Sequence, residues 1–199
     1  MPNVLITKGA AALKKVKDQV KTKESLQALI EAAVPGGSIE SCNATAEILG
    51  DIISSKPLKV VSGFEGKPPA DRVDIVAGLL ETPKMVYLNI IPDHHFVVFP
   101  IDTDKVVILQ GFQGVYSLLD WMKARGTGVI RKDEFLAAMR DMATGSAGEK
   151  TAAAVKLFGY NLAFEGKALS PEAKRVQDEI IDYYKGKTIN LKVCASKEL

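Results

Sequence analysis

The middle of the chain reads MVYLNIIPDHHFVVFPIDTDKVVILQ (residues 85–110) and contains three strand-like runs. The runs are MVYLNI (85–90), HFVVF (95–99) and KVVILQ (105–110). Each is rich in the β-branched and aromatic residues that strands favour, and the segments between them (PD at 92–93, DTD at 102–104) are typical of turns. Because the connections are this short, the sequence predicts an antiparallel β-meander.

Helical periodicity surrounds the meander on both sides. Before it, apolar residues recur at helical spacing over 10–20, 23–33, about 43–54, and 71–80. After it, helices are predicted over 116–124, 132–142, 151–163 and 171–184, and a closing strand over 188–193. Segregation of this kind predicts an α+β fold, with N-terminal helices packed on the meander and additional C-terminal helices. A chain of 199 residues fits a single domain over 1–199.

Composition and charge exclude several classes of function. The formal net charge is only +2 and the Lys and Arg residues are scattered, so no nucleic-acid partner is expected. No apolar run is long enough for stable membrane insertion. The first residues, MPNVLI, do not form a secretory signal peptide, which predicts a cytoplasmic protein or one secreted by a signal-peptide-independent route. The sequence leaves the oligomeric state open.

Two cysteines and two histidines are too few and too badly spaced for a zinc site. The chain also lacks the glycine-rich motifs that bind phosphates or dinucleotides, so no cofactor and no metal are expected. With no signal peptide, Cys42 and Cys194 are expected as reduced thiols rather than as a disulfide. The reactive groups to consider are therefore thiols and imidazoles.

Cys42 lies at the predicted N-terminus of a buried helix. The free N–H groups and the positive dipole end at such a position favour a thiolate, and the same N–H groups can bind an oxyanion. The alternative interpretation is a buried cysteine that acts as a small hydrophobic residue. The polar neighbours Glu40, Ser41 and Asn43 favour the functional interpretation.

His94 and His95 are the two histidines of the chain, and they begin the second run of the meander. Adjacent strand residues point to opposite faces of a sheet, so one of them at most faces a given cleft. A thiol nucleophile needs a base with a pKa near neutrality, and histidine is the usual one. The alternative is a pair of partly solvated turn residues without a function.

Gln110 is the last residue of the third run. In an antiparallel meander the end of one strand lies beside the start of the strand before it, so Gln110 is expected close to His95. Its side-chain carbonyl would accept the Nδ1 proton of the imidazole and hold one tautomer. Asp102 and Asp104 are rivals for this role, but they lie at the turn, at the opposite end of the hairpin. The alternative interpretation is that Gln110 is a polar residue at the end of a strand and has no role in a site.

The order of these groups, with Cys at a helix start, His at a strand start and an amide at the next strand end, resembles the papain-like cysteine peptidase superfamily. HFVV (95–98) is similar to its His-bearing strand. LQGFQGVY (109–116) is similar to the segment where an amide is followed by an aromatic that shields the His–amide hydrogen bond. More specifically, the strand that ends in Gln110, followed by a helix that begins YSL (116–118) and carries Trp121, resembles the compact papain-like domains of bacterial toxins and secreted effectors. The resemblance covers about residues 38–121 and favours His95 over His94.

This resemblance implies a papain-like core with Cys42, His95 and Gln110 as catalytic residues. The implied activity is a thiol-dependent amide hydrolase or acyl transferase that acts on a protein substrate: a cysteine protease, a glutamine deamidase or a transglutaminase. Position 36, where the family has its oxyanion-hole Gln, is Gly36, so the backbone N–H groups of Cys42 and Asn43 (or Ser38 or Ser41) would bind the oxyanion. The alternatives are a catalytically inactive papain-like binding module and a partner or immunity-type interaction protein.

Overall fold

The computed structural model describes residues 3–38, 41–91, 94–109, 129–158, 171–184, 187–188 and 190–199. Its helices are α1 (Asn3–Gln19), α2 (Lys23–Ala33), α3 (Cys42–Ile53), α4 (Pro69–Leu80), α6 (Lys132–Thr144), α7 (Ala147–Phe158) and α8 (Pro171–Tyr184). Its strands are β1 (Lys59–Val60), β2 (Lys84–Ile91), β3 (His94–Pro100), β4 (Lys105–Leu109), β5 (Val129–Arg131) and β6 (Asn190–Glu198). The α+β class expected from the sequence is confirmed.

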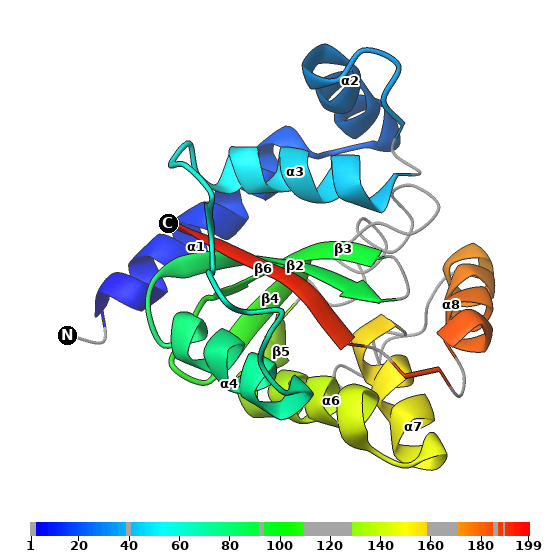
Figure 1. Cartoon of the computed structure of the whole chain (residues 1–199). Coiled ribbons are helices and arrows are strands. Elements are labelled where there is room, and N and C mark those ends of the chain that lie inside the picture. Colours follow the sequence, from blue (N-terminus) through cyan, green and yellow to red (C-terminus); the bar gives the residue numbers. More distant parts are fainter. Residues whose placement is uncertain are drawn as a thin grey trace.

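The strands form one six-stranded antiparallel sheet in the order β1-β6-β2-β3-β4-β5. The predicted meander is confirmed as β2-β3-β4, with Leu88 opposite Phe96 and Val98 opposite Ile108. The last strand of the chain does not close the sheet at an edge. Instead β6 lies between β1 and β2, where Cys194 is opposite Leu88 (Figure 1).

Alternation along the strands divides the sheet into two faces. Tyr87, Asn89 and His95 share one face, whereas Leu88 and Phe96 share the other. Figure 1 shows α1 and α3 over the first face and α4 and α6 below the second. The predicted packing of N-terminal helices on the meander is thus confirmed. The layer on the opposite side contains α4, which also precedes the meander, and α6, which follows it.

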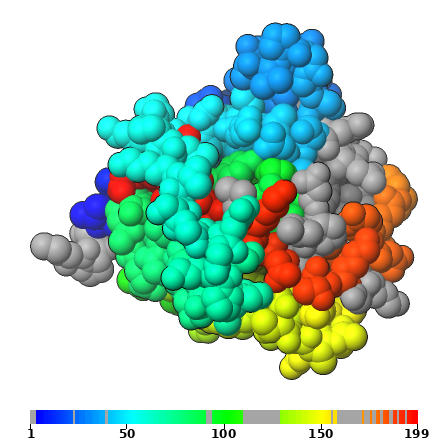
Figure 2. Space-filling view, viewed as in Figure 1, coloured from blue at the N-terminus to red at the C-terminus, as the bar shows by residue number. Residues whose placement is uncertain are grey.

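Helix α3 is held rigidly against the first face because most of its surface is apolar. Leu49 and Ile53 are fully buried, and a Cβ added to Gly50 would lie 3.5 Å from the side chain of Met85 on β2. By contrast, α2 contacts α3 and stands out from the molecule (Figure 2). The predicted N-cap Thr22 begins α2 with a capping box, because its Oγ1 accepts from the Ser25 N–H at 3.1 Å.

Helix α1 begins at Asn3, whereas the sequence predicts a start near residue 10. The prediction missed the first turns because their apolar residues are partly exposed and do not follow the apolar stripe of the helix. The two- and three-residue strands β1 and β5 were not predicted, since such short runs carry no period. The predicted helix over 116–124 and the end of the predicted 38–121 core lie outside the described residues. Among the helices that are described, none has both the length and the apolar content needed to cross a membrane.

Replacing Gly9 by alanine tests the packing of α1 on the sheet. A Cβ at Gly9 would lie 2.2 Å from the carbonyl oxygen of Pro100 and 2.7 Å from the Cα of Ile101, and both are backbone atoms. We expect Gly9→Ala to lower the free energy of unfolding by about 1–3 kcal/mol, the usual cost of overpacking. Urea denaturation measures this change.

Gly78→Ala in α4 is the matched control, because a Cβ there meets nothing within 4 Å. This substitution should raise the free energy of unfolding by about 0.5–1 kcal/mol, since alanine is the better helix former. If both variants were stabilised equally, the close approach of α1 to the end of β3 would be wrong.

Candidate functional site

Cys42 is the first helical residue of α3, as the sequence predicts. Ser41 is the N-cap, and its Oγ accepts a hydrogen bond from the backbone N–H of Ala44 at 3.3 Å. The N–H groups in the first turn of an α-helix have no carbonyl partner within the helix and form the positive end of its dipole. Cys42 is half-buried and is not part of a disulfide, and a helix start of this kind favours the thiolate form of a cysteine.

His95 is the second residue of β3 and is half-buried on the face that α3 covers. It lies opposite Asn89 in the β2–β3 ladder. Tyr87 is two residues before Asn89 and therefore on the same face. The rings of Tyr87 and His95 are tilted by 52° with their centroids 5.7 Å apart.

A chain of hydrogen bonds joins the first turn of α3 to this imidazole. The Tyr87 hydroxyl lies 2.6 Å from Asn43 Oδ1, to which it donates, and 2.6 Å from His95 Nδ1. On the other side of the ring, Asn89 Nδ2 lies 3.2 Å from His95 Nε2. Asn43 directly follows Cys42 in the helix, so the chain connects the imidazole to the residue next to the thiol.

The orientation of the Asn43 amide decides which imidazole tautomer this chain of hydrogen bonds accommodates. A tyrosine hydroxyl has one proton, and here that proton goes to Asn43. Tyr87 must therefore accept a hydrogen bond from His95 Nδ1–H, and Nε2 must accept one from the Asn89 amide. In this first arrangement the proton-free nitrogen is Nε2, on the side of Asn89.

Turning over the two amides reverses every hydrogen bond without moving another heavy atom. Asn43 would then donate to Tyr87, Tyr87 would donate to His95 Nδ1, and His95 Nε2–H would donate to Asn89 Oδ1. In this second arrangement the basic nitrogen is Nδ1. This nitrogen is next to Tyr87, which in turn binds Asn43 of α3. These three hydrogen bonds are therefore compatible with either imidazole tautomer.

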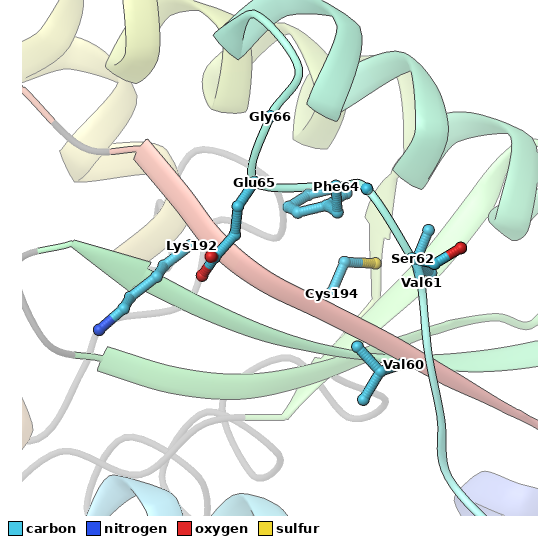
Figure 3. Close-up of a pocket in the computed structure, with 9 residues that line it drawn as sticks. Val60, Val61, Ser62, Phe64, Glu65, Gly66, Lys192 and Cys194 are labelled. Carbon is cyan, nitrogen blue, oxygen red and sulfur yellow. The ribbon is translucent and has the colours of Figure 1, made fainter.

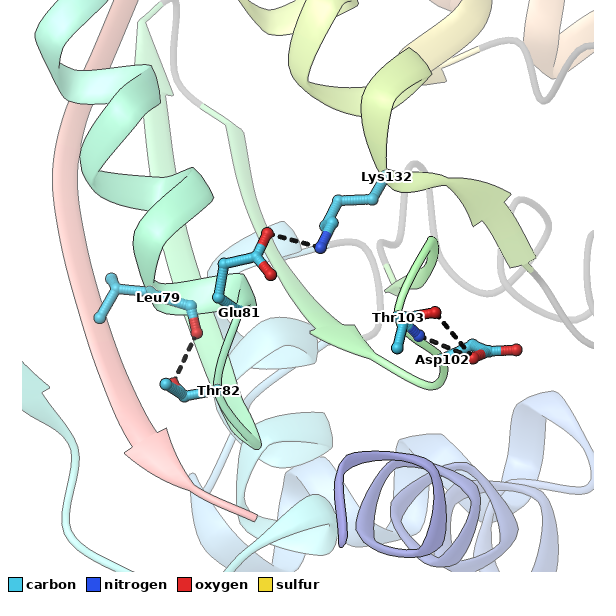
Figure 4. Close-up of polar contacts among 6 residues, drawn as sticks. All are labelled: Leu79, Glu81, Thr82, Asp102, Thr103 and Lys132. Carbon is cyan, nitrogen blue, oxygen red and sulfur yellow. Dashed lines mark hydrogen bonds and ion pairs between the residues drawn. The ribbon is translucent and has the colours of Figure 1, made fainter. Parts of the chain in front are cut away.

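The orienting residue predicted from the sequence, Gln110, lies outside the described residues, just after the end of β4. Its rival Asp102 lies beyond Pro100, at the opposite end of β3 from His95, as expected. There Asp102 Oδ1 accepts from the backbone N–H of Thr103 at 2.7 Å (Figure 4). The same view shows the Lys132–Glu81 ion pair, which has a length of 2.6 Å.

His94 lies on the other face of the sheet, as the alternation predicts. It is only 1 % exposed, and its ring stacks on Phe96 with the centroids 5.7 Å apart. The two histidines are therefore in different environments, and His95 is the one that lies on the side of α3.

Three polar residues of this site were not singled out from the sequence as partners of His95: Asn43, Tyr87 and Asn89. A signal for two of them exists, because Tyr87 and Asn89 are two residues apart in a strand that is otherwise apolar. A polar side chain in such a run indicates a specific partner on the same face. The cross-strand pairing with His95, however, depends on the register.

The second cysteine lies in a chemically different place. Cys194 on β6 is fully buried, and burial raises the pKa of its thiol to about 12. It contributes to a cavity of about 420 Å³ formed with the 60–66 segment and Lys192. Figure 3 shows its side chain directed toward that segment. At neutral pH Cys194 is a protonated, unreactive thiol.

Within the described ranges, no three or more His, Cys, Asp or Glu side chains come together in a way that could hold a metal ion. Comparison of the chain with protein-family models, curated proteins and solved structures found no match.

Proposed function

We propose that the protein is a papain-like, thiol-dependent amide hydrolase or acyl transferase, in which Cys42 is the nucleophile and His95 the general base. The observation that carries the proposal is the hydrogen-bond chain from Asn43 through Tyr87 to His95. It links the imidazole to the side chain of the residue that follows Cys42, at a helix start of the kind that favours a thiolate.

The first half of the reaction forms a thioester. The Tyr87 hydroxyl gives its proton to Nδ1 of the neutral imidazole and takes up the proton of the Cys42 thiol, while Nε2–H donates to Asn89 Oδ1 and the ring becomes cationic. The sulfur then attacks an amide carbonyl carbon and forms a C–S bond. The imidazolium returns its proton to the amide nitrogen, the C–N bond breaks, and an amine or ammonia leaves.

The second half regenerates the thiol. His95 takes a proton from water or from a second amine, which attacks the thioester; the C–S bond then breaks and Cys42 recovers a proton. With a backbone amide and water this is proteolysis, and with a glutamine side chain and water it is deamidation. With a glutamine side chain and an amine it is transglutamination. On this proposal the substrate is a protein in each case.

The developing oxyanion would be bound by the backbone N–H groups of Cys42 and Asn43 in the first turn of α3. Asn89 is the described amide that can orient the imidazole, since it lies 3.2 Å from Nε2. Gln110 remains a prediction for the same role. The resemblance to compact toxin domains supports a secreted bacterial effector or toxin as the biological setting.

One observation favours a second candidate, a binding module that keeps the fold without the reaction. With the amides oriented as they are, the lone pair of His95 is covered by the Asn89 amide. A catalytic site requires this amide to turn over when the ring takes up a proton. A module in which it never turns would bind its protein partner and leave it chemically unchanged.

Replacing Tyr87 by phenylalanine removes the hydroxyl at the centre of the chain and keeps the ring. We expect the rate at which iodoacetamide alkylates Cys42 at pH 7 to fall about two- to tenfold, which corresponds to one net hydrogen bond of about 0.5–1.5 kcal/mol. Mass spectrometry of the Cys42 peptide over time measures the rate.

Tyr183→Phe is the matched control, because this tyrosine is 52 % exposed on α8 and should leave the alkylation rate unchanged. If the alkylation rate were unchanged in both variants, the Tyr87 hydroxyl would have no influence on the reactivity of Cys42, and the proposal would lose its main support.

A further inference from the structure

The outer side of β1 is an open strand edge. Among the described strands, β1 lies at one edge of the sheet and pairs with β6 alone. The backbone N–H of Val61 donates to the carbonyl oxygen of Cys194 on β6 at 2.9 Å. Because the backbone polar groups of an antiparallel strand point alternately to its two sides, those of Val60 point away from β6. Figure 2 shows the segment between α3 and α4 (turquoise) at the surface of the molecule.

The outward polar groups of β1 are available to another chain. In the described part of the protein, the backbone N–H and C=O of Val60 form no hydrogen bond on this outer side. Pro57 has no N–H, but it precedes β1 and so removes no donor from the strand itself. An open edge of this kind is a template for one further strand.

The outer edge of β6 next to β1 is closed by Arg72 of α4. After Val61 the chain turns away from β6, and the Arg72 guanidinium donates to the carbonyl oxygen of Leu191 on β6 at 2.5 Å. It also donates to the carbonyl oxygens of Glu65 at 2.5 Å and Lys67 at 2.8 Å, which holds the loop beside β6. A strand added on this side of the sheet therefore meets its open edge at β1.

The side chains of β1 present one apolar face and one basic face. Val60 is opposite Ala195 and Lys59 is opposite Ser196, so the two side chains lie on different faces of the sheet. Val60 is 72 % exposed, more than any other large hydrophobic side chain in the described ranges, and Leu58 is 44 % exposed. Single exposed hydrophobic residues are common, but two of them at alternate positions along an open edge indicate a surface that a partner covers.

Charge identifies the kind of partner. The segment SKPLKVVS (55–62) contains Lys56 and Lys59 and no acidic residue. Within the described ranges neither lysine forms an ion pair. A second copy paired through its own β1 would bring like charges onto neighbouring strands, which destabilises such a pair. A strand with acidic side chains opposite Lys59 would instead form favourable cross-strand pairs.

We propose that β1 binds an extended segment of a partner protein as an additional strand of the sheet, and that apolar and acidic residues alternate in this segment. The backbone of Val60 supplies hydrogen bonds, which give affinity. Leu58 and Val60 contact the apolar side chains and Lys59 the acidic ones, which gives specificity. This surface shares no residue with the proposed thiol chemistry and is independent of it.

Fluorescence anisotropy of two labelled peptides tests this surface on the full chain. Valine alternates with glutamate in the first peptide and with lysine in the second, and both are blocked at their ends. We expect the glutamate peptide to bind at least about fivefold more tightly, and Lys59→Glu to reverse this preference. Lys8→Glu is the matched control, because it makes the same charge change at an exposed position on α1 and should leave the preference unchanged.

Val60→Pro tests the hydrogen bonds of the edge. It removes an N–H that points away from β6, so the pairing of β1 with β6 keeps its donors. We expect the glutamate peptide to bind about two- to tenfold more weakly, which corresponds to one net hydrogen bond. Val60→Thr keeps the N–H and a β-branched side chain and should change the affinity less than twofold. If Val60→Pro does not fold, Lys59→Glu alone decides the question.

Three results would overturn the proposal. The first is that neither peptide binds at about 1 mM, a weak affinity for any specific surface. The second is an equal effect of Lys59→Glu and Lys8→Glu, since the preference would then not arise at β1. The third is a dimer of the unmodified chain in sedimentation equilibrium that Val60→Pro abolishes and Val60→Thr does not, since the occupant would then be a second copy.

Discussion

Replacing Cys42 by alanine should reduce the rate of amide chemistry at least about 1,000-fold, because the nucleophile that forms the acyl-enzyme is lost. The measurement uses an unfolded protein as a general substrate and follows three products in parallel. New amino termini report proteolysis, free ammonia reports deamidation, and incorporation of a labelled amine into glutamine reports transglutamination. The product that the unmodified chain forms and Cys42→Ala does not form identifies the amide that is attacked and whether water or an amine accepts the acyl group.

Cys194→Ala is the control for the loss of a thiol as such. Cys194 is buried and protonated at neutral pH, so this variant should lose stability but keep the activity per folded molecule. If the unmodified chain and Cys42→Ala gave equal amounts of all three products, the protein would be the binding module and not the enzyme.

Replacing His95 by alanine should lower kcat/KM about 100- to 10,000-fold near neutral pH, which is the usual contribution of a general base. The loss should shrink as the pH rises toward about 9.5, because thiols ionise increasingly at high pH without the help of a base. The pH profile of kcat/KM for both proteins measures this difference.

The pH dependence separates a base from a structural residue. Removing a side chain that only supports the fold would reduce activity by a similar factor at every pH at which the protein stays folded. A loss that is constant between pH 6 and 9.5 would therefore contradict the role of His95, even if the loss were large.

The pattern of the sequence was sufficient to predict the centre of the fold. Three runs of strand-forming residues with short turns predict β2, β3 and β4 and their antiparallel order, and Thr22 marks the start of α2. The place of β6 was not predictable in the same way. Its pairing of Cys194 with Leu88 joins residues far apart in the chain, and no local periodicity records which strand a distant segment will join.

The candidate site was predictable in part for the same reason. The helix start placed Cys42, and alternation along β3 placed His94 and His95 on opposite faces. The partners of His95 depend on the register of β2 against β3, where a slip of one residue would replace Asn89 by a hydrophobic neighbour. Sequence reasoning therefore proposed the thiol and the imidazole but did not name the residues that bind the imidazole.

The rate of Cys42 alkylation by iodoacetamide at pH 6, compared between the unmodified chain and His95→Ala, tests the activated thiol most directly. Cys194 in the same molecule is an internal reference that should stay unlabelled, since burial raises the pKa of its thiol to about 12. We expect Cys42 to react at least about tenfold faster than a free peptide thiol, and His95→Ala to remove this difference. A Cys42 that reacts no faster than the peptide, with or without His95, would contradict the proposed thiol–imidazole pair.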